Sequence, residues 1–271
     1  MTRLSEAVIA DIGSCLRYYN KELMDKTGYS LFEIACLAAN TTKGAVLELV
    51  YNTKAAIVPI TAGRGIIQGF SQTIKDIVTY LGTEAFVTKG FDIGGLAEGI
   101  ELGADLIFLA DDTRFIAINI SKKRVVDNAE ATARGYVAAL KCMVKNLNNL
   151  EILVLGAGRV GYRAILTLIE HGARVTVYDC DKNKLSFLQG REGIAIENNL
   201  VEALYRYRII FDASPAKDII TEEHIQTDTL VIAPGVPIAL TPKACEKIGK
   251  RIIHDPLQIG VATMLLLAIT P

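Results

Sequence analysis

The chain has 271 residues, of which 51% are hydrophobic, and its 29 Lys and Arg against 30 Asp and Glu leave a net charge of −1. Because this balance supplies no basic field, no nucleic-acid partner is expected. With 22 glycines and 7 prolines, the composition excludes collagen-like and low-complexity chains, and the length favours two folded domains.

The first half of the chain is expected to alternate helices and strands around a small α/β sheet. Apolar side chains spaced by three and four residues predict helices over 4–24 and about 30–42. Ser71 is a suitable N-cap for a helix that ends near 82, and a further helix ends near 102. Short apolar runs predict strands at 55–60, 85–88, 105–110 and 115–120.

The second half is more regular. A helical stretch over 129–145 ends in the polar patch 146–149, after which strands and helices alternate. This pattern predicts a doubly wound parallel sheet, the Rossmann fold. We therefore expect a smaller α/β domain at 1–128 and a Rossmann domain at 129–271, entered through the helix at 129–145. The expected strands are 151–156, 174–179, 193–196, 209–214 and 230–235, and the expected helices are 159–171, 182–189, 199–206 and 258–269.

The cysteines, the histidines and the lengths of the apolar runs indicate the cellular compartment of the protein. The 5 cysteines form no C-x-x-C pair, and the 3 histidines lie near none of them. No disulfide framework or metal site is therefore expected. The first residues carry charges and no signal-peptide block, and the longest apolar run, 261–269, is far shorter than the ~20 residues that span a bilayer. A cytoplasmic protein without a membrane partner is expected.

A Gly-x-Gly-x-x-Gly sequence directly after the strand at 151–155 is the strongest functional signal. Gly156 allows the tight turn, Gly158 lets a pyrophosphate approach the backbone, and Gly161 lets the helix pack on its strand. Arg159 and Val160 open that helix, whose N–H groups would face the phosphates. With a strand before it and a helix after it, the sequence predicts a dinucleotide site.

Asp179 ends the next strand, close to the spacing of ~20 residues expected for a ribose-binding acid. A carboxylate there accepts hydrogen bonds from the ribose hydroxyls and repels a 2′-phosphate. NAD is therefore favoured as the cofactor, while the nearby Arg174 and Lys182 leave NADP open.

Three further segments are candidates to line the nicotinamide end of the cofactor, because ligands of doubly wound sheets bind at the carboxyl ends of the strands. Two of them follow strands and could equally be plain strand ends, and the third opens the last helix and could equally be packing. The residues are Ala213, Ser214 and Pro215, then Pro234, Gly235 and Val236, and finally Ile259 and Gly260.

The glycine-rich segment 61–69 lies between a strand and a helix, so its N–H groups could form an anion-binding nest or simply a flexible connection. Phe70, next to it, could line a pocket or belong to the core. Asp111 and Asp112 end a strand, where one carboxylate could take a proton from a substrate ammonium. Asn128 could bind substrate or cap a helix.

The sequence resembles the pyrrolysine-biosynthesis dehydrogenase family PylD over essentially the whole chain. The glycine fingerprint is generic, whereas the other stretches together are specific. They are Ile57–Gly63 and Gly65–Ile67, Phe70–Ser71, Gly103–Ala104 with Ala110–Asp112, and Leu257–Leu265.

The resemblance implies an NAD-dependent oxidation of the isopeptide L-lysine-Nε-(3-methyl-D-ornithine). The terminal amine of the ornithine part becomes an imine, ammonia is lost, and the semialdehyde cyclises to pyrrolysine. It also implies that an N-terminal substrate-binding domain faces the Rossmann domain, with the substrate between them.

The resemblance assigns roles in the first domain as well. Asp111 would take the proton of the reacting amine, with Asp112 as the alternative. The walls and polar contacts of the substrate pocket would come from Leu4, Phe70, Thr61, Ala62, Gly63, Ser71 and Asn128.

Two alternatives are another NAD-linked amine or amino-acid dehydrogenase on the same architecture, and a non-catalytic NAD-sensing module. The apolar last helix hints at a homodimer.

Overall fold

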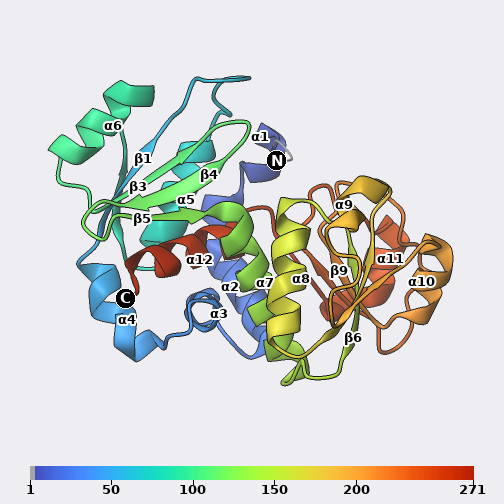
Figure 1. Cartoon of the computed structure of the whole chain (residues 1–271). Coiled ribbons are helices and arrows are strands. Elements are labelled where there is room, and N and C mark those ends of the chain that lie inside the picture. The colour runs from blue at the N-terminus through green and yellow to red at the C-terminus, as the bar shows by residue number, and fades with distance from the viewer. Residues whose placement is uncertain (1–3) are drawn as a thin grey trace. The chain divides into compact units, whose positions relative to one another are not determined.

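The computed structural model describes residues 4–271, which fold into two compact units (Figure 1). Of the described residues, the first unit comprises 4–25, Tyr29–Ala138 and Leu257–Pro271, and the second comprises Lys26–Gly28 and Ala139–Pro256. This division differs from the expected boundary after residue 128 in two respects: the connecting helix changes unit only after Ala138, and the last helix belongs to the first unit.

The first unit contains a five-stranded mixed sheet with strand order β2-β1-β3-β4-β5. Strand β1 pairs in parallel with β2 and β3, whereas β3, β4 and β5 form an antiparallel meander. Strand β5 was not predicted, because it has four residues and its Val125 is 54% exposed at the sheet edge. The strands are β1 Lys54–Val58, β2 Glu84–Val87, β3 Leu106–Ala110, β4 Phe115–Asn119 and β5 Arg124–Asp127.

Helices surround this sheet. The helix predicted over 4–24 is broken near Asp11 into two, and the short helix α4 was not predicted. Ser30 and Glu33 form a reciprocal capping box that starts α3. The helices of this unit are α1 Glu6–Ile9, α2 Ile12–Thr27 (up to Asp25), α3 Leu31–Ala38, α4 Lys43–Tyr51, α5 Phe70–Tyr80, α6 Asp92–Glu101, α7 Asn128–Val144 (up to Ala138) and α12 Gln258–Ile269.

The last helix, α12, is buried on all sides, which is why it belongs to the first unit. It packs on α3, α4 and α5 and on strands β4 and β5. Met264, Leu265 and Leu266 are each 0% exposed. An apolar helix gains most from burial around its whole circumference. The apolar residues that suggested a homodimer are thus used inside the chain, and a homodimer stays a prediction without that support.

Side chains of the β4–β5 hairpin hold the C-terminal end of α12. The Arg124 Nη1 donates to the carbonyl oxygens of Leu267 at 3.0 Å and Thr270 at 2.6 Å, and Lys122 Nζ donates to that of Ile269. Asn119 Nδ2 donates to Ala268 O at 3.1 Å. These donors satisfy carbonyls that a helix leaves without partners, and the cations complement the negative end of its dipole.

Arg124→Ala is expected to lower the free energy of unfolding by about 2 kcal/mol, because two charge-assisted hydrogen bonds are lost and carbonyls are left buried. Urea and thermal unfolding measure the loss. Arg191→Ala is a matched control, because residue 191 is exposed on the second unit. Equal stability of the two variants would show that the hairpin does not hold α12.

The second unit is a six-stranded, all-parallel sheet with strand order β11-β10-β9-β6-β7-β8. Renumbered from β6, this is the 3-2-1-4-5-6 order of the Rossmann fold, which confirms the predicted fold class. The strands are β6 Glu151–Leu155, β7 Arg174–Tyr178, β8 Ile194–Ile196, β9 Ile209–Asp212, β10 Leu230–Ala233 and β11 Ile252–His254. The helices are α8 Arg159–Glu170, α9 Lys182–Ser186, α10 Leu200–Arg206 and the unpredicted α11 Pro242–Ile248, which a 3₁₀ turn Gly249–Arg251 follows.

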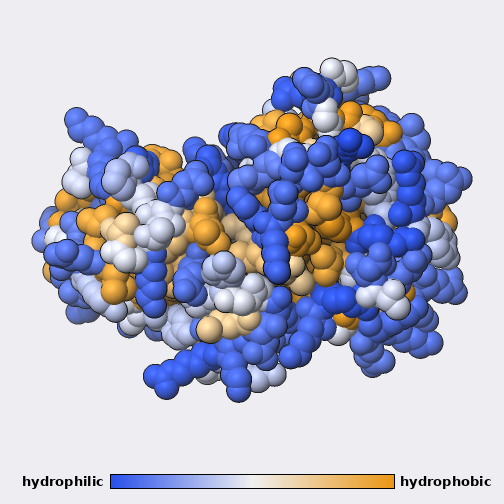
Figure 2. All heavy atoms as spheres, turned by 90° about the horizontal axis from the view of Figure 1, so that it is seen from below, coloured by the Kyte–Doolittle hydropathy of each residue, from blue (hydrophilic) through white to orange (hydrophobic). Residues whose placement is uncertain are grey.

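The surface is mixed in character. Hydrophilic side chains cover much of the face seen in Figure 2, and apolar residues show between them in several places. Highly exposed large apolar side chains include Ile93 of α6, Tyr18 of α2 and Phe187, which follows α9. Among the helices of residues 4–271, none has the length and apolar character that a membrane span requires.

Candidate functional site

The glycine turn of the second unit uses each of its three glycines for a different reason. Gly156 has φ +88°, and its N–H donates to Tyr178 O at 2.8 Å. A Cβ on Gly161 would lie 1.9 Å from Gly156 O, so only glycine lets α8 pack this closely. A Cβ on Gly158 would meet no heavy atom within 4 Å. Backbone at Gly158 is therefore open to close approach by a ligand.

Gly158 is the N-cap of α8 and has no side chain with which to cap it. Arg159 and Val160 form the first turn, as the sequence predicted. Helix N-termini of this kind bind phosphate, because N–H groups and the helix dipole both favour a negative charge there. The turn can accept a pyrophosphate at this end of β6.

Asp179 lies at the carboxyl end of β7 and points to the same turn. Its carboxylate accepts hydrogen bonds from the N–H groups of Ala157 and Asp181, each at 2.8 Å, and Lys184 Nζ is 3.7 Å away. The side chain is 6% exposed. A carboxylate can accept about four hydrogen bonds, so two from backbone leave capacity for hydroxyl donors.

Asp212, which the sequence analysis missed, organises the neighbouring loops. It is 0% exposed and accepts from Ser214 Oγ at 2.6 Å, Ser214 N at 3.1 Å and Ala239 N at 3.2 Å. Burial raises the pKa of this carboxyl, against the lowering effect of these hydrogen bonds and of His254. An Asp at the end of a buried strand, two residues before a Ser, is the signal that could have identified it.

The loops after β9 and β10 lie together beside the glycine turn. A Cβ on Gly156 would lie 3.0 Å from Ala213 O, and one on Gly235 would lie 2.4 Å from Ser214 O. Pro215 belongs to the first loop, and Pro234 and Val236 to the second. The structure thus brings these predicted residues to one edge of the sheet, whereas Ile259 and Gly260 belong to the first unit, where both are buried at the start of α12.

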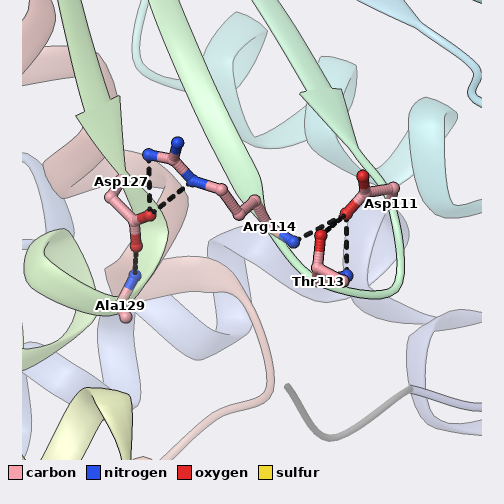
Figure 3. A network of polar contacts seen from close by, with 5 residues as sticks. All are labelled: Asp111, Thr113, Arg114, Asp127 and Ala129. Atoms are coloured by element: carbon pink, nitrogen blue, oxygen red, sulfur yellow. Dashed lines mark hydrogen bonds and ion pairs between the residues drawn. The ribbon is translucent and has the colours of Figure 1, made fainter.

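In the first unit, Asp111 is an exposed residue of the turn between β3 and β4 (Figure 3). Its Oδ1 accepts from Thr113 N, Thr113 Oγ1 and Arg114 N, each at 2.7 Å. The Thr113 hydroxyl, followed by the Arg114 and Thr113 N–H groups, holds the pKa of Asp111 below its usual value. Its Oδ2 makes no hydrogen bond to the described part of the chain and points away from the turn. The result is an ionised carboxylate with one fixed and one available oxygen.

Asp112 has a different role. Its Oδ2 accepts from Arg64 N at 2.7 Å, and a Cβ on Gly63 would lie 2.2 Å from the same oxygen. Gly63 has φ +74°. Asp112 therefore connects the glycine-rich loop 61–69, at Gly63 and Arg64, to the β3–β4 turn.

An ion pair connects this turn to the start of α7. Arg114 Nε and Nη2 both lie 3.3 Å from Asp127 Oδ2, and Asp127 Oδ1 accepts from Ala129 N at 2.9 Å (Figure 3). Asn128, the first residue of α7, accepts from Thr132 Oγ1 at 3.3 Å. A Cβ on Gly260 would lie 3.0 Å from Asn128 Oδ1, so Asn128 is beside the start of α12.

The remaining predicted substrate residues are partly exposed. Phe70 begins α5 and contacts Phe115 edge to face, with ring centroids 5.5 Å apart. Ser71 follows it, and both are half-buried, as is Leu4. Within residues 4–271 no group of three or more His, Cys, Asp or Glu side chains could hold a metal ion.

Comparison with known proteins matches both halves of the chain. The family model "Pyrrolysine biosynthesis protein PylD, N-terminal domain" matches residues 9–126, and "Alanine dehydrogenase/PNT, C-terminal domain" matches 127–247. The chain is 35% identical over 212 residues to pyrrolysine synthase of Methanosarcina acetivorans, covering 78% of this chain and 81% of that protein. It is 32% identical to pyrrolysine synthase of Methanosarcina barkeri, covering 78% and 80%.

Among solved structures, shikimate dehydrogenase of Aquifex aeolicus is similar in fold, with a TM-score of 0.55 at 17% identity over 78% of this chain and 89% of that chain. This likeness concerns the fold alone. The sequence matches confirm the resemblance inferred from the loops around Thr61 and Asp111.

Proposed function

The chain belongs to the pyrrolysine synthase family, and on that premise we propose that it is an oxidoreductase that completes pyrrolysine. The substrate is L-lysine-Nε-(3-methyl-D-ornithine). Its terminal CH₂–NH₂ group loses a hydride and a proton to become an imine, water hydrolyses the imine to an aldehyde and ammonia, and the aldehyde condenses with the ornithine α-amine with loss of water. The observation that carries this proposal is the 35% identity to pyrrolysine synthase over 78% of the chain.

The residues of the second unit fit a nicotinamide dinucleotide. The open space at Gly158 and the uncapped start of α8 suit a pyrophosphate. Asp179 would hold the ribose hydroxyls, and its charge with that of Asp181 favours NAD over NADP. When bound, the oxidised nicotinamide ring accepts the hydride. Nicotinamide contacts are proposed for the loops around Ser214 and Gly235.

We assign the proton acceptor to Asp111. Hydride leaves readily only from a neutral amine, yet a free alkylamine with a pKa of ~10.4 is protonated near neutral pH. The available Oδ2 of Asp111 can bind the ammonium and accept its proton, and a substrate that covers this exposed carboxylate would raise its basicity by desolvation. Asp112 is less suited, because its Oδ2 already accepts from Arg64 N and lies where a Cβ on residue 63 would be.

The other contacts follow from the same loops. The backbone of Thr61, Ala62 and Gly63 and the side chains of Ser71 and Asn128 offer polar groups to a dipeptide-like molecule. Leu4 and Phe70 offer apolar ones. All of these residues belong to the first unit.

The test is mass spectrometry of the product formed from the isopeptide and NAD, with NADH followed by absorbance and NADP run in parallel. Pyrrolysine with release of ammonia supports the proposal. Preference for ornithine, lysine or glutamate would indicate another amine or amino-acid dehydrogenase, and tight NAD binding without turnover of any amine would indicate a sensing module.

The pH profile is expected to be flat on its acid side. Because the pKa of Asp111 lies below the ordinary ~3.9, the carboxylate stays ionised above that pH, and activity should fall only as pH drops through the lowered pKa. We expect kcat/KM to vary by less than about two-fold between pH 5 and 8. Steady-state rates in buffers of constant ionic strength measure this. An inflection between pH 5 and 7 would instead require a group of higher pKa as the proton acceptor.

A further inference from the structure

Asp92 is a carboxylate that holds the first residue of the glycine-rich loop. It begins α6 and has φ +52°, a conformation that Asp and Asn tolerate better than most residues. Its Oδ1 accepts from Thr61 N at 2.8 Å, and its Oδ2 accepts from the Thr61 hydroxyl. Its own N–H donates to Pro59 O at 3.0 Å. Asp92 thus contacts both the backbone and the side chain of Thr61.

This contact fixes the direction of the Thr61 hydroxyl. A hydroxyl has one hydrogen to donate, and an ionised carboxylate can only accept. The Thr61 hydroxyl, followed by its N–H, lowers the pKa of Asp92, so the carboxylate is ionised near neutral pH. Since the only hydrogen of Thr61 Oγ1 is directed at Asp92, the exposed side of that oxygen offers lone pairs alone. It can accept a hydrogen bond from a ligand but cannot donate one.

We propose that Asp92 is a positioning residue that makes Thr61 Oγ1 an acceptor for an N–H group of the substrate other than the amine being oxidised. The inference rests on the proposed function. The isopeptide carries such groups on its lysine α-ammonium, its ornithine α-amine and its amide. Two carboxylates contact this loop, Asp92 at Thr61 and Asp112 at Arg64 N, whereas the loop itself contains one cationic side chain, that of Arg64. The excess of negative charge favours a cationic group over a carboxylate at Thr61 Oγ1.

Asp92→Asn separates the direction of the hydroxyl from the shape of the loop. The asparagine carbonyl can still accept from Thr61 N, so the loop keeps its backbone contact. Its NH₂ group now donates to Thr61 Oγ1, which turns the hydroxyl hydrogen outward and makes Thr61 a donor. Glu98→Gln is the matched control, because Glu98 lies on the same helix and accepts from Lys89 N at 3.1 Å and Gly90 N at 2.7 Å, away from Thr61.

We expect Asp92→Asn to raise KM for the isopeptide by about 10- to 100-fold, the effect of one lost charge-assisted hydrogen bond, while kcat changes little. Glu98→Gln should leave both constants unchanged. This result would show that loss of one negative charge from α6 does not by itself raise KM. In a Thr61→Val background, Asp92→Asn should add little, because the two substitutions remove the same interaction. Thermal unfolding checks that each variant is folded.

Two analogues complete the test, one lacking the lysine α-amino group and one lacking the ornithine α-amino group. If one of the two α-amino groups is the donor, the rise in KM caused by Asp92→Asn should disappear for the analogue that lacks that group. If the amide N–H is the donor, the rise in KM should persist for both analogues and should still be absent in the Thr61→Val background. A full penalty in the Thr61→Val background, or no penalty on the isopeptide, overturns the inference alone. Failure of the wild type to turn over the isopeptide overturns both the inference and the proposed function.

Discussion

Asp111→Asn is expected to lower kcat by about 10³-fold, within the range that a positioned general base contributes. The asparagine carbonyl can still accept the three hydrogen bonds that now reach Asp111 Oδ1, so the β3–β4 turn keeps its shape. In place of the available Oδ2, however, the variant presents an NH₂ group, which neither accepts a proton nor attracts an ammonium. Cofactor affinity should stay unchanged, because the glycine turn belongs to the second unit.

Asp112→Asn is the matched comparison for this prediction, since it removes the same charge from the adjacent residue. Its carbonyl can still accept from Arg64 N. We expect kcat to be largely kept, with KM changed through the glycine-rich loop. Single-turnover kinetics measure the chemical step, and NADH titration measures cofactor affinity, so an effect on the reaction is separated from an effect on cofactor binding. A near-normal rate for Asp111→Asn would remove Asp111 from the mechanism, and a rate lost only in Asp112→Asn would transfer the role to Asp112.

The second unit could be predicted from the sequence because its signals are local. The strand, the glycine turn and the helix that contain Gly156 and Gly161 are consecutive, and Asp179 follows at the spacing of one βαβ unit. The parallel sheet then follows from the alternation of strands and helices. Helix α11 was not predicted, although Thr241 at its N-cap and Pro242 at its first position are a clear N-terminal signal.

The first unit was harder because its organisation depends on distant contacts. Helix α12 is joined to the sheet by Arg124, which lies 143 and 146 residues before the two residues whose carbonyls it binds. The acidic pair at 111–112 was a candidate from the sequence, but the contact that distinguishes its two members, the hydrogen bond from Arg64 N to Asp112, joins residues 48 positions apart. Asp92 gave no signal in the sequence, because it resembles any acid in the first turn of a helix.

Gly158→Ala is expected to weaken cofactor binding by about 100-fold while leaving the free energy of unfolding within about 0.5 kcal/mol of the wild type. Gly158 has φ −68°, which alanine adopts without strain, and the added Cβ meets no heavy atom within 4 Å. The methyl group would instead occupy the space through which a pyrophosphate approaches the backbone. NADH titration by fluorescence and thermal unfolding measure the two quantities on the same sample.

Gly161→Ala should behave differently, and the contrast identifies the cause. There the added Cβ would lie 1.9 Å from Gly156 O, so α8 must move away from its strand. We expect a loss of about 1–3 kcal/mol in stability together with weaker cofactor binding. If Gly158→Ala bound NADH as tightly as the wild type, the dinucleotide would not cross this turn. The assignment of the second unit as the cofactor domain would then rest on the fold alone, because Asp179 can bind the ribose only if the pyrophosphate of the same dinucleotide lies at Gly158.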